Sequence, residues 1–133
     1  MIRVVVDASI APKWYLAEVH EVAAPRLLGG GYAMAAPAIL TSEFTSVALQ
    51  KHRRGQLTRD EANTLAARAV RLPVRLFDTR DYLAHAYALA QEFHPSVYDC
   101  LYAALGLSLG CEVVTAERPF YAALSRPFPE TML

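Results

Sequence analysis

Residues 2–9 read IRVVVDAS, a short run rich in apolar, β-branched residues that ends at a carboxylate. Continuous apolar runs of this kind are typical of a strand buried on both faces of a parallel sheet. Asp7 follows the run directly, and Ser9 is placed to cap a helix that extends through residues 14–18. A buried strand followed at once by a helix is the unit from which α/β domains are built. The opening residues therefore favour an α/β fold.

The rest of the chain continues to alternate between strand and helix patterns. We expect further strands near residues 32–36, 74–77, 112–114 and 130–133, and helices near residues 21–28, 39–54, 58–72, 80–93, 97–109 and after residue 115. Gly55 ends one of these helices, and Thr58 with Glu61 has the spacing of a capping box. Right-handed crossovers between such strands predict a parallel sheet of about four to five strands, with helices on both faces.

The composition fits one compact domain over residues 1–133. Apolar residues make up 54% of the chain, enough for a sizeable core, and no linker or repeat divides it. The 13 basic and 13 acidic residues cancel, which excludes an overall positive field that would attract nucleic acid or an anionic membrane. No stretch approaches the roughly 18 apolar residues of a membrane span, and the first residues do not form a secretory signal. We therefore expect a cytoplasmic protein without a membrane partner.

Four carboxylates lie where the predicted elements would bring them together. Asp7 ends the first strand, and Glu117 comes just after the strand near residues 112–114. Asp99 lies one turn into a helix, and Glu43 lies on the apolar face of another. Ligands of parallel α/β sheets bind beyond the carboxyl ends of the strands. These acids are therefore candidates for a common site at that edge.

Each of these acids also has a purely structural interpretation. Ser96 and Asp99 have the spacing of a capping box, Glu117 suits the first turn of a helix, and Asp7 is placed to cap the next helix. Glu43 is the hardest to explain in this way, because a carboxylate on an apolar face is costly without a partner. If all four meet, their pKa values rise unless a cation neutralises them. Oxygen ligands select Mg²⁺ or Mn²⁺.

Five segments of the chain resemble PIN-domain proteins, in particular the VapC-type toxins of bacterial and archaeal toxin–antitoxin pairs. They are VVVDASIAPKW (residues 4–14), SEF (42–44), LTRDEA (57–62), SVYDCLYAALG (96–106) and VVTAERPF (113–120), which occur in the family's order and approximate spacing. The resemblance implies a three-layer PIN-like fold. It also implies that Asp7, Glu43, Asp99 and Glu117 are the acidic quartet, which holds one or two Mg²⁺ or Mn²⁺ ions for cleavage of RNA phosphodiester bonds.

Three further residues take supporting roles by the same resemblance. Ser9 and Thr115 match the small hydroxyl residues that flank the quartet. Ser46 lies where the family commonly has Asn, one helical turn after Glu43, and Glu117 lies where the family usually has Asp. The longer Glu117 side chain and the missing Asn are the departures from the family pattern.

The function implied is that of a metal-dependent endoribonuclease toxin, silenced by a cognate antitoxin and forming a homodimer. Residues 51–80 hold eight basic and three acidic side chains, and from this region we take Lys51, Arg53 and Arg54 as candidates for RNA binding. The alternative is a PIN-fold module that binds RNA or an antitoxin with weakened or lost nuclease activity. A phosphoacceptor receiver domain is disfavoured, because it needs paired acids after the first strand and a late lysine.

Overall fold

The computed structural model describes residues 2–16, 27–127 and 131–132. These residues form a five-stranded parallel sheet with the strand order β3-β2-β1-β4-β5. The strands are β1 (Ile2–Val6), β2 (Tyr32–Pro37), β3 (Arg75–Phe77), β4 (Glu112–Val114) and β5 (Thr131–Met132). The predicted parallel sheet and its strand positions are therefore confirmed.

Strand β1 lies in the middle of the sheet, which explains its continuous apolar run. It pairs with β2 on one side and with β4 on the other, so that Val5 is aligned with both Ala35 and Val113. Val4, Val5 and Val6 are at most 2% exposed. A central strand has no solvent-facing side, and the β-branched side chains fill both faces of the sheet.

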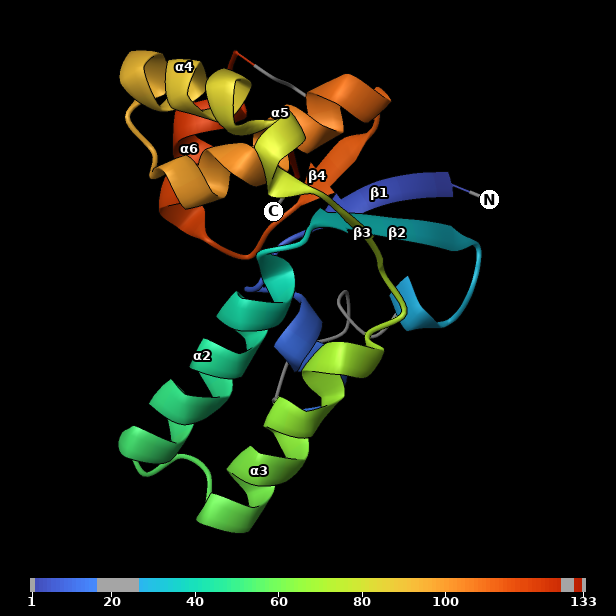
Figure 1. The fold of residues 1–133 in the computed structure, drawn as a ribbon, viewed down its shortest axis with the longest axis vertical. Coiled ribbons are helices and arrows are strands. Elements are labelled where there is room, and N and C mark those ends of the chain that lie inside the picture. Colours follow the sequence, from blue (N-terminus) through green and yellow to red (C-terminus); the bar gives the residue numbers. More distant parts are fainter. Residues whose placement is uncertain (1, 17–26, 128–130, 133) are drawn as a thin grey trace.

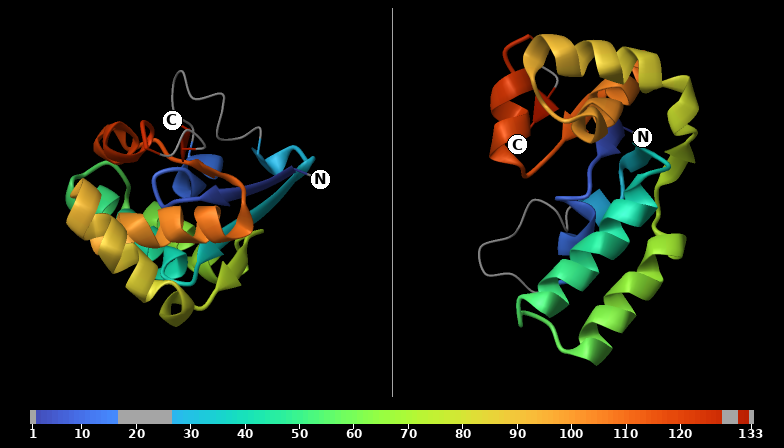
Figure 2. Two further views of the ribbon diagram at one scale, coloured as in Figure 1. Left: turned by 90° about the horizontal axis from the view of Figure 1, so that it is seen from above. Right: turned by 60° about the vertical axis from the view of Figure 1, so that its left-hand side comes forward.

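Helices cover both sides of this sheet. They are η1 (Ala11–Trp14), α2 (Leu40–Arg53), α3 (Arg59–Ala67), η2 (Arg68–Arg71), η3 (Thr79–Asp81), α4 (Leu83–Phe93), α5 (Val97–Leu109) and α6 (Arg118–Leu124), where η denotes a 3₁₀ helix. Helices α4, α5 and α6 lie on one side of the sheet, and η1, α2 and α3 lie on the other (Figure 1; Figure 2, right). The expected three-layer α/β arrangement is confirmed. Within the described ranges, no helix is long and apolar enough to cross a bilayer.

Local sequence signals set several of the helix boundaries. Thr58 and Glu61 form the predicted capping box, in which each side chain accepts a hydrogen bond from the other residue's backbone N–H, at 3.1 and 2.9 Å. Helix α2 ends just before Gly55, which has a φ of 74°. Helix α5 ends at Gly110, whose φ of 64° is the left-handed conformation that glycine adopts without strain.

Two helix starts differ from the sequence prediction. Ser9 does not cap a helix: η1 starts two residues later, because the Ser9 hydroxyl and backbone N–H both donate to the Asp7 carboxylate. The helix expected from residue 80 begins instead as the 3₁₀ turn η3. There the Asp78 carboxylate accepts a hydrogen bond from the Arg80 backbone N–H and caps this tighter turn, and α4 starts at Leu83.

Two other predicted helices differ from the structure or lie partly outside it. The helix predicted to run from residue 58 to Pro73 divides into α3 and the 3₁₀ helix η2. Residues 17–26, which hold most of the helix expected over residues 21–28 and the end of the one expected through residues 14–18, lie outside the described residues.

Helix α5 has more buried residues than any other described helix, and it connects the core to the carboxyl ends of the strands. Every residue from 100 to 106 is buried, and the helix packs across β1, β2 and β4. Gly106 allows this close approach, because a Cβ atom there would collide with the Val113 side chain. The N-terminal turn of α5, with Asp99, is thereby fixed relative to the sheet.

Candidate active site

Asp7 is the most buried carboxylate of the candidate site. It follows β1 directly and is 3% exposed. Its Oδ1 atom accepts hydrogen bonds from the backbone N–H of Ser9, at 2.9 Å, and from the Ser9 hydroxyl. Its backbone carbonyl accepts from the N–H groups of Ile10 and Ala11, which begins the turn into η1. The chain reversal after β1 therefore holds this carboxylate in a fixed orientation.

Two hydroxyl groups join Asp7 to the segment that follows β4. The Ser9 Oγ atom accepts a hydrogen bond of 2.7 Å from the backbone N–H of Ala116 and lies 3.4 Å from Thr115 Oγ1. Thr115, which is fully buried, accepts a hydrogen bond of 3.0 Å from the backbone N–H of Glu117. The predicted supporting residues Ser9 and Thr115 thus lie between Asp7 and Glu117 and hold the two segments together.

Glu43 and Asp99 approach from two other elements. Glu43 lies in the first turn of α2, and its Oε1 atom accepts a hydrogen bond of 2.6 Å from the hydroxyl of Tyr102 in α5. Asp99 lies one turn before Tyr102. The Ser96 hydroxyl caps α5 by accepting from the Asp99 backbone N–H at 3.1 Å. The cap contact therefore uses the backbone N–H of Asp99.

The pKa values show that the four acids act on one another. Burial raises the pKa of Asp7 to about 6, against the hydrogen bonds from Ser9 and Thr115, and the charge of Glu117 adds to the rise. Burial also raises the pKa of Asp99 to about 6, with further contributions from the charges of Glu117, Asp7 and Glu43, against a hydrogen bond from Ser96. The pKa of Glu43 is raised by burial and by Glu117, against the hydrogen bond from Tyr102. The charge of Glu117 therefore acts on each of the other three acids, and Asp99 is also influenced by Asp7 and Glu43.

The donor set of this group fits a hard divalent cation. Within the described part of the chain, no three carboxylate, imidazole or thiol groups lie close enough together to hold one metal ion between them. Mg²⁺ does not require such a cage, because it retains several waters and commonly binds through one or two carboxylates together with substrate phosphates. Carboxylates whose pKa values are raised by burial and mutual repulsion are the groups whose ionised form a cation stabilises.

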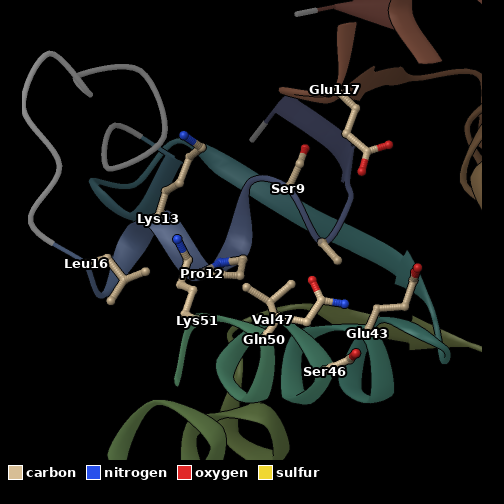
Figure 3. A pocket seen from close by; sticks show the side chains of 11 residues that line it. Ser9, Pro12, Lys13, Leu16, Glu43, Ser46, Val47, Gln50, Lys51 and Glu117 are labelled. Atoms are coloured by element: carbon tan, nitrogen blue, oxygen red, sulfur yellow. The ribbon is translucent and has the colours of Figure 1, made fainter. Parts of the chain in front are cut away.

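A pocket of about 500 Å³ opens between η1 and α2 beside these acids (Figure 3). It is lined by Ala8, Ser9, Pro12, Lys13, Leu16, Glu43, Ser46, Val47, Gln50, Lys51 and Glu117. Figure 3 shows Glu43 and Glu117 at one end and Lys13 and Lys51 at the other. The pocket therefore changes from acidic to basic along its length.

The basic residues predicted for RNA binding lie in two different places. Lys51 lines the pocket, whereas Arg53 and Arg54 are exposed at the end of α2 and do not line it. Lys13 takes a position in the pocket that sequence reasoning missed, because its proximity to α2 depends on the turn after Asp7. Tyr102 was also missed, although its spacing of three residues from Asp99 places both on one face of α5.

Aromatic residues near the strand ends have different surroundings. Tyr98, next to Asp99, is 57% exposed. Tyr15 instead packs against the Phe44 ring, at 6.2 Å between centroids, and under the Arg68 guanidinium, at 4.4 Å. Tyr98 is thus available to a ligand, whereas Tyr15 is part of the packing between η1, α2 and η2.

Three solved structures share this fold at low sequence identity. PAE2754 from Pyrobaculum aerophilum matches with a TM-score of 0.69 and 18% identity, covering 92% of this chain and 84% of that one. VapC20 of Mycobacterium tuberculosis, described as a toxin that cleaves the sarcin–ricin loop, matches with a TM-score of 0.68 and 18% identity, covering 91% and 95%. A chain of a toxin–antitoxin complex from Klebsiella pneumoniae matches with a TM-score of 0.59 and 13% identity, covering 98% and 96%.

No curated protein matches the chain. The PIN domain family model matches residues 4–123, which include all four acids, both supporting hydroxyl residues and the pocket between η1 and α2. The chain therefore belongs to the PIN domain family.

Proposed function

We propose that this protein is a Mg²⁺- or Mn²⁺-dependent endoribonuclease and the toxin of a toxin–antitoxin pair. The observation that carries the proposal is the group of four acids whose charges act on one another, two of which, Glu43 and Glu117, line the acidic end of the pocket. Membership of the PIN domain family supports a nuclease, and the fold shared with VapC20 supports a toxin that acts on RNA. The proposed location is the cytoplasm.

The four acids would have two roles in metal binding. Asp7 and Asp99 would hold the principal ion, while Glu43 and Glu117 would hold a second ion or orient the attacking water. A bound divalent ion supplies positive charge that offsets the charge of the phosphate, and it lowers the pKa of water. Ser9 keeps Asp7 in place by donating to Oδ1, and Thr115 anchors the backbone of Glu117. These contacts orient the carboxylates before the substrate binds.

The basic end of the pocket would take the RNA backbone. Lys13 and Lys51 line it opposite Glu43 and Glu117, so a strand bound there would have one phosphate near the acids and another near the lysines. The exposed Tyr98 ring would stack on a base. Arg53 and Arg54, farther along α2, would extend the contact with the phosphates.

The proposed protein partners are a cognate antitoxin and a second copy of the chain. The Klebsiella pneumoniae structure is a toxin–antitoxin complex, and its matched chain and this one overlap over almost their full lengths. Large apolar side chains are exposed on several elements, among them Val70, Leu83 and Tyr87, which are 84%, 45% and 58% exposed. Leu83 and Tyr87 lie one turn apart on α4, and a protein partner would cover this pair.

The direct test is cleavage of a labelled single-stranded RNA by the purified protein. We expect cleavage with Mg²⁺ or Mn²⁺, none with EDTA, and none from the Asp7→Asn and Asp99→Asn variants. The Asp81→Asn variant, which changes an exposed acid of η3, is the matched control and should cleave normally. Equal cleavage in EDTA would contradict the proposal.

The second candidate is a PIN-fold module that binds RNA or an antitoxin without cleaving. Glu117 favours it, because its side chain is longer than the Asp usual in the family and its exposed position constrains it less. In the same experiment this candidate predicts that RNA is bound and left intact at every metal concentration.

A further inference from the structure

Helix α5 contributes two residues to the candidate site from one face. Asp99 and Tyr102 are three positions apart, so they lie one above the other on the helix surface. The carboxylate of Asp99 belongs to the acidic group, whereas Tyr102 reaches across to Glu43 on α2. The same helical turn therefore provides one acid directly and contacts a second acid that comes from another element.

The hydrogen bond from Tyr102 gives the two carboxylate oxygens of Glu43 different surroundings. The Tyr102 hydroxyl donates to Oε1 at 2.6 Å, the short distance typical of a hydroxyl bound to a carboxylate. Oε2 is then the oxygen left for a cation or a water. A glutamate side chain is long and flexible, so fixing it on a cation costs conformational entropy. A partner that already holds the side chain reduces this cost before the cation binds.

Tyr102 is well suited to hold another residue in position. Its side chain is only 1% exposed, and α5 is fixed against β1, β2 and β4. Glu43, by contrast, is half-buried and lines the open pocket. The rigid partner in this contact is therefore the tyrosine, and the group that gains order is the glutamate.

We propose that Tyr102 is a positioning residue that fixes Glu43 through Oε1 and so presents Oε2 to a divalent cation. The inference rests on the proposed function, because it assigns Tyr102 a role in the metal site of that function. Tyr102 acts only through Glu43, which distinguishes it from a residue that merely fills the core.

The test is a double-mutant cycle on Mn²⁺ affinity, measured by calorimetry on the protein without RNA. Tyr102→Phe removes only the hydroxyl and should weaken Mn²⁺ binding about tenfold, the scale found when a group that orients a metal ligand is removed. In a Glu43→Ala background the same Tyr102→Phe change should alter the affinity less than about twofold, because nothing remains to be positioned. Tyr82→Phe, a half-buried tyrosine that packs on Phe77, is the matched control and should bind Mn²⁺ normally.

Two results would overturn the inference. One is a Tyr102→Phe protein with unchanged Mn²⁺ affinity. The other is a Tyr102→Phe change that weakens Mn²⁺ binding equally in the wild-type and Glu43→Ala backgrounds, which would indicate a general structural effect. A wild-type protein that binds no Mn²⁺ at all would refute the proposed function and the inference with it. Melting temperatures without metal accompany each variant, so that a loss of folding is recognised separately from a loss of affinity.

Discussion

Ser9 and Ala116 are 107 residues apart in the sequence, and the Ser9 hydroxyl accepts a 2.7 Å hydrogen bond from the Ala116 backbone N–H. The same hydroxyl donates to the Asp7 carboxylate. One small side chain therefore connects the turn after β1 to the segment after β4, and it orients a buried acid at the same time. The geometry of the site depends on this contact as much as on the acids.

Removing the Ser9 hydroxyl should destabilise the protein. Ser9→Ala leaves the Ala116 N–H without its acceptor and takes one donor from Asp7, so we expect a loss of about 1–3 kcal/mol in the free energy of unfolding. Ser46→Ala changes an exposed serine of α2 and should stay within about 0.5 kcal/mol of the wild type. Urea unfolding of both variants measures the difference. Equal stabilities would show that the Ser9 contact contributes nothing.

The buried Asp7 should make the metal-free protein less stable as the pH rises. Its pKa is about 6 in the folded state against an ordinary 3.8, so between these values the folded state binds more protons than the unfolded state. Stability is then highest below about pH 4 and is lost as the pH rises through 6, by at most about 3 kcal/mol at 1.36 kcal/mol per pKa unit. Asp7→Asn should remove this part of the pH dependence and raise the melting temperature at pH 7.5.

The measurement is the difference between the wild-type and Asp7→Asn stability curves from pH 4 to pH 8. Subtracting the two curves removes the contribution of groups that do not interact with Asp7, such as Asp78. The hydrogen bonds and charge of Arg80 hold the pKa of Asp78 at about 2, which gives the opposite slope at lower pH. A flat difference curve would contradict the raised pKa of Asp7.

Mg²⁺ or Mn²⁺ should raise the melting temperature of the wild type. A ligand that binds only the folded state at a hundred times its Kd stabilises by about 2.7 kcal/mol. The increase should be small in Asp7→Asn and Asp99→Asn and normal in the exposed control Asp81→Asn. Thermal melting with and without EDTA tests this, and an increase of the same size in all four proteins would place the metal elsewhere.

Shortening Glu117 should preserve the activity. Glu117→Asp restores the residue usual in the family, so we expect Mg²⁺-dependent cleavage that is equal to or higher than that of the wild type. Glu117→Ala should lower it, but less than Asp7→Asn does, because Glu117 is exposed and Asp7 is buried. Cleavage rates measured over a range of Mg²⁺ concentrations separate the variants. An inactive Glu117→Asp would show that Glu117 does not stand in for that Asp.

Neutralising Lys51 should weaken RNA binding without a preference for sequence. In an Asp7→Asn background, which leaves the RNA intact, Lys51→Gln should lower the affinity and reduce the slope of log K against log salt by about 0.7. Arg59→Gln is the control, because Arg59 lines a separate groove between α2 and α3. Fluorescence anisotropy at several salt concentrations gives both slopes. An unchanged slope for Lys51→Gln would remove this residue from the proposed RNA path.

The sequence predicted those parts of the fold that depend on local signals. Val4 to Val6 marked the central strand because burial on both faces requires an unbroken apolar run. Helix α5 has the predicted bounds because Ser96 caps it and Gly110 ends it. The division into α3 and η2, and the start of α4 after a 3₁₀ turn, were not predicted, since these depend on tertiary packing and on a side-chain contact at Asp78.

The sequence located the four acids and the hydroxyl residues Ser9 and Thr115, but not the contact from Tyr102. Each of the four acids occupies a strand end or a helix turn that the sequence pattern locates. The hydrogen bond from Tyr102 to Glu43 joins residues 59 positions apart, and the orientation of both side chains is set by how α5 packs on the sheet. The basic residues were predicted by their number in one region, but their division between the pocket and the end of α2 depends on helix faces in the folded chain.

The strand order also makes the site depend on a long-range pairing. β1 is the first strand and β4 the fourth, and they are neighbours in the sheet although β2 and β3 lie between them in the sequence. Asp7, Glu43 and Asp99 all precede β4, so a fragment that ends before residue 112 contains three of the four acids and lacks Glu117. It also lacks the Ala116 N–H group, which donates a hydrogen bond to the Ser9 hydroxyl. Long-range pairings of this kind are the slow contacts in folding. The segment from β4 onward therefore supplies both the fourth acid and the backbone N–H that contacts Ser9, so the acidic group is complete only when β4 pairs with β1.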